Sequence, residues 1–315
     1  MAIDPIYEHF VADPRNTVRP PPPEVPMEKV RRAANAAMDQ GDTPEMAVLA
    51  DEIIESGGYP VAIRHYRPTD APELPVIFFC HGGGFVWGNI DTHDGICRRL
   101  AAATGAAVIS IDYRLAPEYP YPTPVQDTLA VVNAVLDDAD AYRVMAENFA
   151  LCGDSAGGNV MLYACLQLVA QGRAPSQLAL LYPALDPACD SASQAEFADG
   201  PLLTRDAMKW FWDCYLGADQ NGNYRMPTQT EIQGLPPTTI LTAEIDPLRD
   251  EAEKFATQLA EAGTTVRTTR CEGLLHGFLS LPVQPPTVAR HLQYEVYAPL
   301  QEALSTRPGK VESTN

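Results

Sequence analysis

The stretch that decides the fold is FALCGDSAGGNVMLYACLQLVAQG, residues 149–172. A short apolar run leads directly into GDSAG, and a long apolar run of helical composition follows it at once. Small residues beside Ser155 are what a sharp turn from a strand into a helix needs, because its backbone is strained and crowded. Such a turn lifts the Ser155 hydroxyl above a sheet and leaves the Ala156 amide at a helix N-terminus. A phosphate-binding loop is the alternative, but no Lys follows the glycines as that motif requires.

Apolar runs alternate with helical patterns on both sides of this turn. The runs are near-continuously apolar, which is typical of strands covered on both faces, and strand-helix alternation predicts a mostly parallel sheet flanked by helices. Two earlier stretches, joined by Gly57-Gly58, predict a β-hairpin. We expect strands at 46–55, 60–67, 75–80, 106–113, 149–153, 177–183, 238–245 and 264–271, and helices near 91–103, 123–138, 250–263 and 286–304.

Two segments, 1–45 and 186–225, break the alternation. Both contain stretches with helical apolar spacing, 27–40 and 204–217. Ligands of such sheets sit beyond the carboxyl ends of the strands, so these segments are predicted to form a helical cap over a site there, with peripheral decoration as the alternative. The predicted domains are therefore 1–45 (N-terminal part of the cap), 46–185 (catalytic, first part), 186–225 (cap insertion) and 226–315 (catalytic, second part).

Composition excludes several classes of function. The chain has 315 residues and a net charge of −19, which disfavours nucleic acid and anionic membrane surfaces as partners. No apolar run approaches the roughly 18 residues of a membrane span, and the first ten residues lack the features of a signal peptide. Seven scattered cysteines without a CxxC pair predict buried free thiols in the cytoplasm and no metal site.

A triple-glycine turn supplies the second motif. His81-Gly82-Gly83-Gly84-Phe85 follows the apolar run PVIFFC directly. Glycines expose successive amides without obstruction, and amides aimed at one point stabilise a developing oxyanion. A flexible turn is the alternative, but this turn and a serine turn after a later strand rarely occur together by accident.

A serine nucleophile needs a general base and an acid that orients it. In this architecture the chain order is serine, acid, histidine, so only His276 and His291 qualify as the base. His276 is favoured because it follows the last strand, whereas His291 lies within a helical pattern. Asp246 is the favoured acid because it ends a strand. Asp186, at a similar place after the strand at 177–183, and Asp250, a predicted helix cap, are its rivals.

Aromatic residues near the motifs are candidate walls of a substrate pocket. At helical spacing such residues are also often plain core. The candidates are Phe85, Trp87, Tyr182, Trp210, Phe211 and Tyr215.

These motifs together resemble the bacterial hormone-sensitive-lipase-like carboxylesterases, a branch of the α/β-hydrolases with GDSAG around the serine. The matching stretches are HGGGF (81–85), THD (92–94), DYRLAPE (112–118), GDSAGG (153–158), LLYP (180–183), DPLRDE (246–251) and HGF (276–278).

The resemblance implies an eight-stranded sheet with an antiparallel second strand, and a helical cap. It implies the triad Ser155, Asp246 and His276, and oxyanion donors at Gly83, Gly84 and Ala156, with His81 and Gly82 shaping the loop. It further implies hydrolysis of short-to-medium acyl esters through an acyl-enzyme, without a metal or organic cofactor.

Some alternatives stay open at this point. The same triad serves amidases, lactonases and thioesterases, and a non-catalytic receptor of small ligands can share the fold. The expected partner is a small-molecule ester. The chain is expected to be a monomer or a homodimer, because the strand at 264–271 would be a sheet edge open to pairing, although it carries two Arg.

Overall fold

The computed structural model describes residues 3–38, 43–217 and 224–305. One sheet of eight strands organises the chain, in the order β1-β2-β4-β3-β5-β6-β7-β8. Strand β2 is antiparallel to both of its neighbours and the other pairings are parallel, as the family resemblance implied. The strands are β1 (Val48–Ser56), β2 (Tyr59–Arg67), β3 (Leu74–Cys80), β4 (Ala107–Asp112), β5 (Val144–Asp154), β6 (Gln177–Leu181), β7 (Thr238–Ile245) and β8 (Val266–Leu275).

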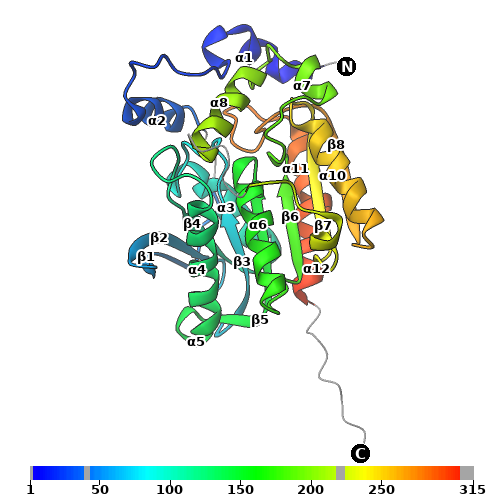
Figure 1. Cartoon of the computed structure of the whole chain (residues 1–315). Helices are drawn as coiled ribbons and strands as arrows, with labels where there is room; N and C mark the ends of the chain where they lie inside the picture. Colours follow the sequence, from blue (N-terminus) through cyan, green and yellow to red (C-terminus); the bar gives the residue numbers. More distant parts are fainter. Residues whose placement is uncertain (1–2, 39–42, 218–223, 306–315) are drawn as a thin grey trace, which may run out of the picture.

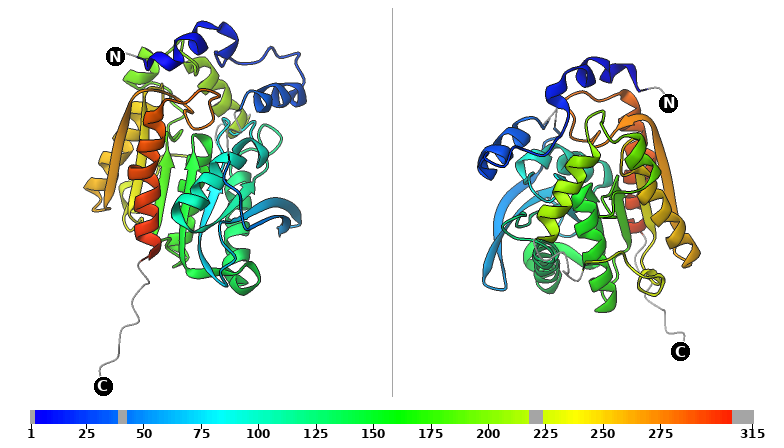
Figure 2. Two further views of the ribbon diagram at one scale, coloured as in Figure 1. Left: turned by 180° about the vertical axis from the view of Figure 1, so that it is seen from behind. Right: turned by 45° about the horizontal axis from the view of Figure 1, so that its top comes forward.

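Helices cover both faces of the sheet, and each face has its own apolar core (Figure 1). The interior strands β3 and β6 are buried almost throughout, which explains why their sequences lack polar alternation. One face carries α4 (Thr123–Asp137), α6 (Ala156–Ala170) and α10 (Arg249–Glu261). The other face carries α3 (Asp94–Thr104), α11 (Pro286–Leu292), the π-helical η4 (Gln293–Tyr297) and α12 (Ala298–Ser305), and the left view of Figure 2 shows it from behind. Short elements complete the body: η3 (Asp91–His93), α5 (Ala139–Tyr142) and α9 (Gln229–Ile232).

Two strands, β5 and β8, extend by several residues beyond their predicted limits, and in both the pairing register shifts. Strand β5 begins at Val144 because that residue pairs with Leu74, and a shift in register follows before Val76. Strand β8 continues to Leu275, which pairs with Ile245 beyond a second shift. The extension brings residue 276 to the carboxyl end of the sheet, directly after β8.

The two segments that break the alternation lie together above the carboxyl ends of the strands (Figures 1 and 2). We call their described residues, 3–38 and 186–217, the cover. Its parts meet where the Val18 amide donates to the Leu202 carbonyl at 2.6 Å and the Thr204 hydroxyl donates to the Val18 carbonyl at 2.9 Å. The cover contains η1 (Pro5–Tyr7), α1 (Glu8–Ala12), η2 (Pro14–Asn16), α2 (Met27–Ala36), α7 (Ala192–Glu196) and α8 (Arg205–Leu216).

The two longest helices of the cover differ in how they are held. Helix α8 buries five residues, whereas α2 buries none. Helix α2 ends at Ala36, short of the predicted 27–40, and residues 39–42 lie outside the described ranges. Among the described residues, none of the helices has the length and apolar character needed to cross a bilayer.

Candidate active site

Ser155 stands on a sharp turn between β5 and α6. Its φ of 50° lies in the left-handed region, where a side chain is strained. The turn fits because its neighbours are small: a Cβ on Gly157 would overlap the Cys80 carbonyl, and one on Gly153 would overlap the Gly157 backbone. The sequence therefore places the buried Ser155 at the carboxyl end of β5, where it lines a cavity.

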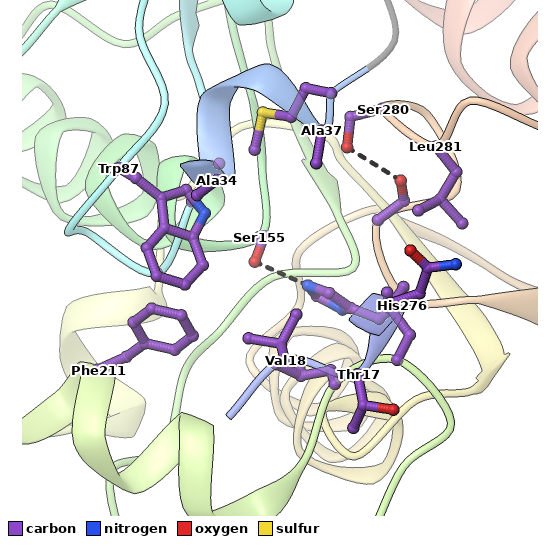
Figure 3. A pocket seen from close by; sticks show the side chains of 18 of the residues that line it. Thr17, Val18, Ala34, Ala37, Trp87, Ser155, Phe211, His276, Ser280 and Leu281 are labelled. Carbon is purple, nitrogen blue, oxygen red and sulfur yellow. Dashed lines mark hydrogen bonds between the residues drawn. The ribbon is translucent and has the colours of Figure 1, made fainter. Parts of the chain in front are cut away.

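Three side chains from the ends of three strands form one hydrogen-bonded chain, of which Figure 3 shows the link between Ser155 and His276. Ser155 Oγ lies 2.9 Å from His276 Nε2, and His276 Nδ1 lies 2.7 Å from Asp246 Oδ2. Asp246 is fully buried, and its other oxygen accepts the Leu248 amide at 2.9 Å. This arrangement fixes the imidazole with Nε2 toward the hydroxyl, so that it can accept the hydroxyl proton.

The rival residues are occupied elsewhere. Asp186 accepts the Ala188 amide at 3.0 Å, and Asp250 accepts the Ser193 amide at 2.8 Å. His291 lies on α11, away from the serine turn. The structure thus brings together the three residues that the sequence favoured.

The glycine turn after β3 lines the same cavity as the serine. Gly83 and Gly84 have φ of 123° and 59°, and both line the same cavity as Ser155. The Gly82 amide is already used, because it donates to Asp154 Oδ1 at 2.8 Å. By contrast, the amides of Gly83, Gly84 and Ala156 donate no hydrogen bond within the described part of the chain.

Buried polar groups hold this turn from below. The His81 ring stacks on Tyr113 with centroids 4.4 Å apart, and the Tyr113 hydroxyl donates to the His81 carbonyl at 2.7 Å. Burial lowers the pKa of His81 to about 3, so His81 is neutral and structural. Asp154 lies 3.4 Å from His93; burial opposes its charge, yet His93 and the Gly82 amide keep its pKa below the usual value.

A cavity of about 590 Å³ opens above Ser155 and His276. Trp87 and Phe211 form part of its wall, as predicted (Figure 3). The other four aromatic candidates do not line it, because packing takes up their rings. Phe85 stacks on Tyr215 at 3.7 Å, Tyr182 packs its edge against His276 at 5.2 Å, and Trp210 lies against Phe211 at 5.1 Å.

The N-terminal segment, which the sequence predicted as part of a cap over the site, supplies wall residues that the sequence analysis did not name. Thr17 and Val18 face the imidazole, and one side of α2 faces the cavity (Figure 3). The signal was present: the wall residues of and after α2 have the i, i+3, i+4, i+7 spacing of one helix face. They are Val30, Ala33, Ala34 and Ala37.

Comparison with known proteins gives consistent results. A family model described as alpha/beta hydrolase fold matches residues 77–280. Carboxylic ester hydrolase LipN of Mycobacterium tuberculosis is 39% identical over 70% of this chain, which spans 61% of LipN. Ethyl acetate hydrolase of Pseudomonas putida is 32% identical over 78% of this chain and 80% of that protein.

Solved structures agree with these relatives. A mutant of esterase rPPE superposes with a TM-score of 0.89 at 29% identity, covering 97% of this chain and 99% of that chain. The hyperthermophilic esterase of Pyrobaculum calidifontis superposes with a TM-score of 0.86 at 31% identity, covering 96% and 99%.

Proposed function

The chain belongs to the alpha/beta hydrolase family, in its hormone-sensitive-lipase-like branch of carboxylesterases, and from this premise we propose that Ser155, His276 and Asp246 are its catalytic triad. The observation that carries the proposal is the continuous hydrogen-bonded chain from hydroxyl to imidazole to buried carboxylate. Ser155 supplies the nucleophilic hydroxyl, His276 the general base, and Asp246 the carboxylate that orients the imidazole.

In the first half of the reaction, Ser155 Oγ attacks the ester carbonyl carbon while His276 Nε2 takes the hydroxyl proton. The tetrahedral intermediate collapses as the bond to the alcohol oxygen breaks, and the imidazolium gives its proton to the departing alcohol. Asp246 stays ionised and stabilises the imidazolium. An acyl group is then bound to Ser155.

In the second half, water takes the place of the serine hydroxyl. His276 accepts a proton from the water, whose oxygen attacks the acyl carbon. The second tetrahedral intermediate collapses, Ser155 Oγ recovers the proton, and the carboxylic acid leaves.

We propose that the amides of Gly83, Gly84 and Ala156 stabilise the oxyanion of both intermediates. Their freedom from other acceptors supports this role, since a donor already engaged could not turn to the substrate. Fixed donors at a developing negative charge lower the barrier substantially; losing one costs about 3 kcal/mol in studied hydrolases.

The proposed substrates are small esters with short-to-medium acyl chains. A cavity of about 590 Å³ with walls of Val, Ala, Trp and Phe suits a modest apolar group beside the ester. The cover would act as the cap, because residues from both of its parts line that cavity.

Replacement of the nucleophile tests the function. Ser155→Ala should reduce kcat on p-nitrophenyl butyrate by several orders of magnitude and leave the fold intact. The matched control is Ser280→Ala, which lies on the same cavity but donates to the Gly277 carbonyl at 3.1 Å. Near-normal activity in Ser155→Ala would refute the proposal, and the equivalent p-nitroanilide substrate separates an esterase from an amidase.

A further inference from the structure

Helix α2 is held on the molecule by polar contacts. It buries no residue, although the half-buried Met27 at its start packs against the core, and its Arg31 side chain bonds to two carbonyls of the catalytic body. Arg31 Nε donates to the Val86 carbonyl at 2.7 Å, and Nη2 donates to the Ala116 carbonyl at 2.9 Å. Asn35, one turn further along α2, accepts the Gly88 amide at 2.9 Å.

Two of the groups that α2 contacts, the Val86 carbonyl and the Gly88 amide, belong to the glycine turn of the active site. Residues 83–88 form this turn, because the amides of Val86 and Trp87 both donate to the Gly83 carbonyl, at 3.1 and 3.0 Å. Arg31 and Asn35 therefore contact the same turn that carries Gly83 and Gly84 at the cavity. The turn has no regular secondary structure beyond these bonds.

The guanidinium of Arg31 is itself fixed in place. Glu118 accepts from Nη1 at 2.9 Å and from Nη2 at 2.5 Å, a two-point contact that restricts the guanidinium plane. The bond to Arg31 lowers the pKa of Glu118, so the carboxylate is charged at neutral pH. Arg31 thus connects α2, the glycine turn and the loop at 116–118.

We propose that Arg31 is a positioning residue for the oxyanion donors: it keeps the turn at 83–88 in the conformation that aims the Gly83 and Gly84 amides at the substrate. The inference rests on the proposed function. Glycines with positive φ give the turn little stiffness of its own, whereas donors must lie within a few tenths of an ångström of their optimum. A displacement of 1 Å near a reacting centre can cost roughly 100-fold in rate.

The same contacts could serve only to fix α2 as a pocket wall, and the two roles predict different kinetics. A wall contributes to substrate binding, so its loosening raises KM. A support for oxyanion donors acts on the transition state, so its loss lowers kcat and weakens binding of tetrahedral analogues.

The test compares Arg31→Gln with Arg32→Gln, its neighbour on α2, which is 74% exposed and, among residues 3–38, 43–217 and 224–305, pairs with Glu28 of the same helix alone. For p-nitrophenyl acetate, Arg31→Gln should lower kcat roughly tenfold and change KM less than about twofold. The Ki of a trifluoromethyl ketone, which forms a tetrahedral adduct with the serine, should rise in proportion. Arg32→Gln should match the wild type.

Two further variants keep the test decisive. Arg31→Lys retains the charge but not the fork that reaches two carbonyls, so it should recover only part of kcat. Glu118→Gln should give a smaller loss in the same direction. An unchanged kcat in Arg31→Gln, a rise in KM alone, or a fall in kcat with unchanged Ki would each overturn the inference. None of these results would touch the triad, which fails only if Ser155→Ala remains active.

Discussion

The glycine turn of the active site lies between two helices that support it by different means. On one side, α8 presses the Phe211 ring so close to Gly84 that a Cβ there would overlap it. On the other side, α2 reaches the same turn through Arg31 and Asn35. One support consists of apolar packing and the other of hydrogen bonds, although both helices also line the cavity.

Because of this difference, we expect the two helices to affect different quantities, α8 the free energy of unfolding and α2 the catalytic rate. Burial of large apolar side chains stabilises a fold by about 25 cal/mol per Å² of surface, so α8 should contribute strongly to the free energy of unfolding. Exposed ion pairs contribute about 0–1 kcal/mol, so α2 should contribute little. Loss of α2's contacts should therefore be detected in kinetics before it is detected in unfolding.

The largest effect is expected from Trp212→Ala on α8. Trp212 is 2% exposed and packs against Phe85 and Tyr224, with ring centroids 5.2 Å apart in both cases. Deleting a buried aromatic ring lowers the free energy of unfolding by about 3–5 kcal/mol, which urea unfolding measures. The control is Trp210→Ala on the same helix. Trp210 is only partly buried and does not line the cavity, so we expect a smaller loss and an unchanged acyl-chain profile.

Equal destabilisation by the two tryptophan variants would contradict the view that α8 is held by its buried face. A changed acyl-chain profile in Trp210→Ala would restore that residue to the pocket wall.

Gly84→Ala attacks the contact between α8 and the turn directly. The added methyl group would overlap the Phe211 ring at a φ of 59°, so the turn must move, and kcat should fall by about 100-fold. Gly57→Ala is the matched control. Its φ is 55°, but nothing lies within 4 Å of the added Cβ, so it should cost about 1 kcal/mol of stability and no activity. Full activity in Gly84→Ala would remove the turn from the mechanism.

A smaller effect is expected when the wall formed by α2 is thickened. Ala34→Leu adds volume toward the cavity, where Figure 3 shows the Ala34 side chain. Activity on p-nitrophenyl octanoate should fall several-fold relative to the acetate, while the melting temperature stays within about 2 °C because α2 buries nothing. Ala36→Leu, on the exposed side of the same helix, should change neither quantity. Identical profiles for the two variants would argue against α2 as a wall.

The smallest effect concerns pH. Two carboxyl groups, Glu118 and Glu251, anchor the cover, and the stability that each contributes should change with pH in opposite directions. The bond to Arg31 lowers the pKa of Glu118, so its stabilisation is present above the ordinary value of 4.5 and is lost as pH falls. Burial raises the pKa of Glu251 from 4.5 to about 8, and this carboxyl accepts the Leu185 and Asp186 amides at the start of the insertion. Its stabilisation is present below pH 4.5 and is lost as pH rises through about 8.

Hydrogen exchange, corrected for the intrinsic pH dependence of amide exchange, measures the protection of the amides near both carboxyl groups. Acid should lower protection in α2, and mild base should lower it at residues 185–186. Glu118→Gln and Glu251→Gln should each abolish only their own dependence. Protection that changes in the same direction in both regions would contradict the assignment.

The proposed catalytic triad could be predicted because each of its residues follows an apolar strand. Chain order and position at strand ends selected Asp246 and His276 over their rivals, since the carboxyl ends of parallel strands meet at one edge. The hairpin at Gly57-Gly58 was equally clear, because its turn signal is local.

The pocket wall was harder to predict. Phe85 and Tyr215 lie far apart in the sequence and stack on each other, so spacing alone could not distinguish core from wall. The polar residues Glu147 and Asn148 concealed the start of β5, whose pairing with Leu74 depends on the tertiary structure. The approach of Val18 to Leu202 likewise has no local signal.

The contact of Val18 with Leu202 and Thr204 has a consequence for folding during synthesis. Val18 and its partner Thr204 are separated by 186 residues, and at synthesis rates of 5–20 residues per second the second emerges roughly 10–40 s after the first. The leading segment must wait on the ribosome with its apolar side chains unpaired. Assembly over the nucleophile is therefore a late step, and a nascent chain stalled before the insertion should carry a formed hairpin but no enclosed pocket.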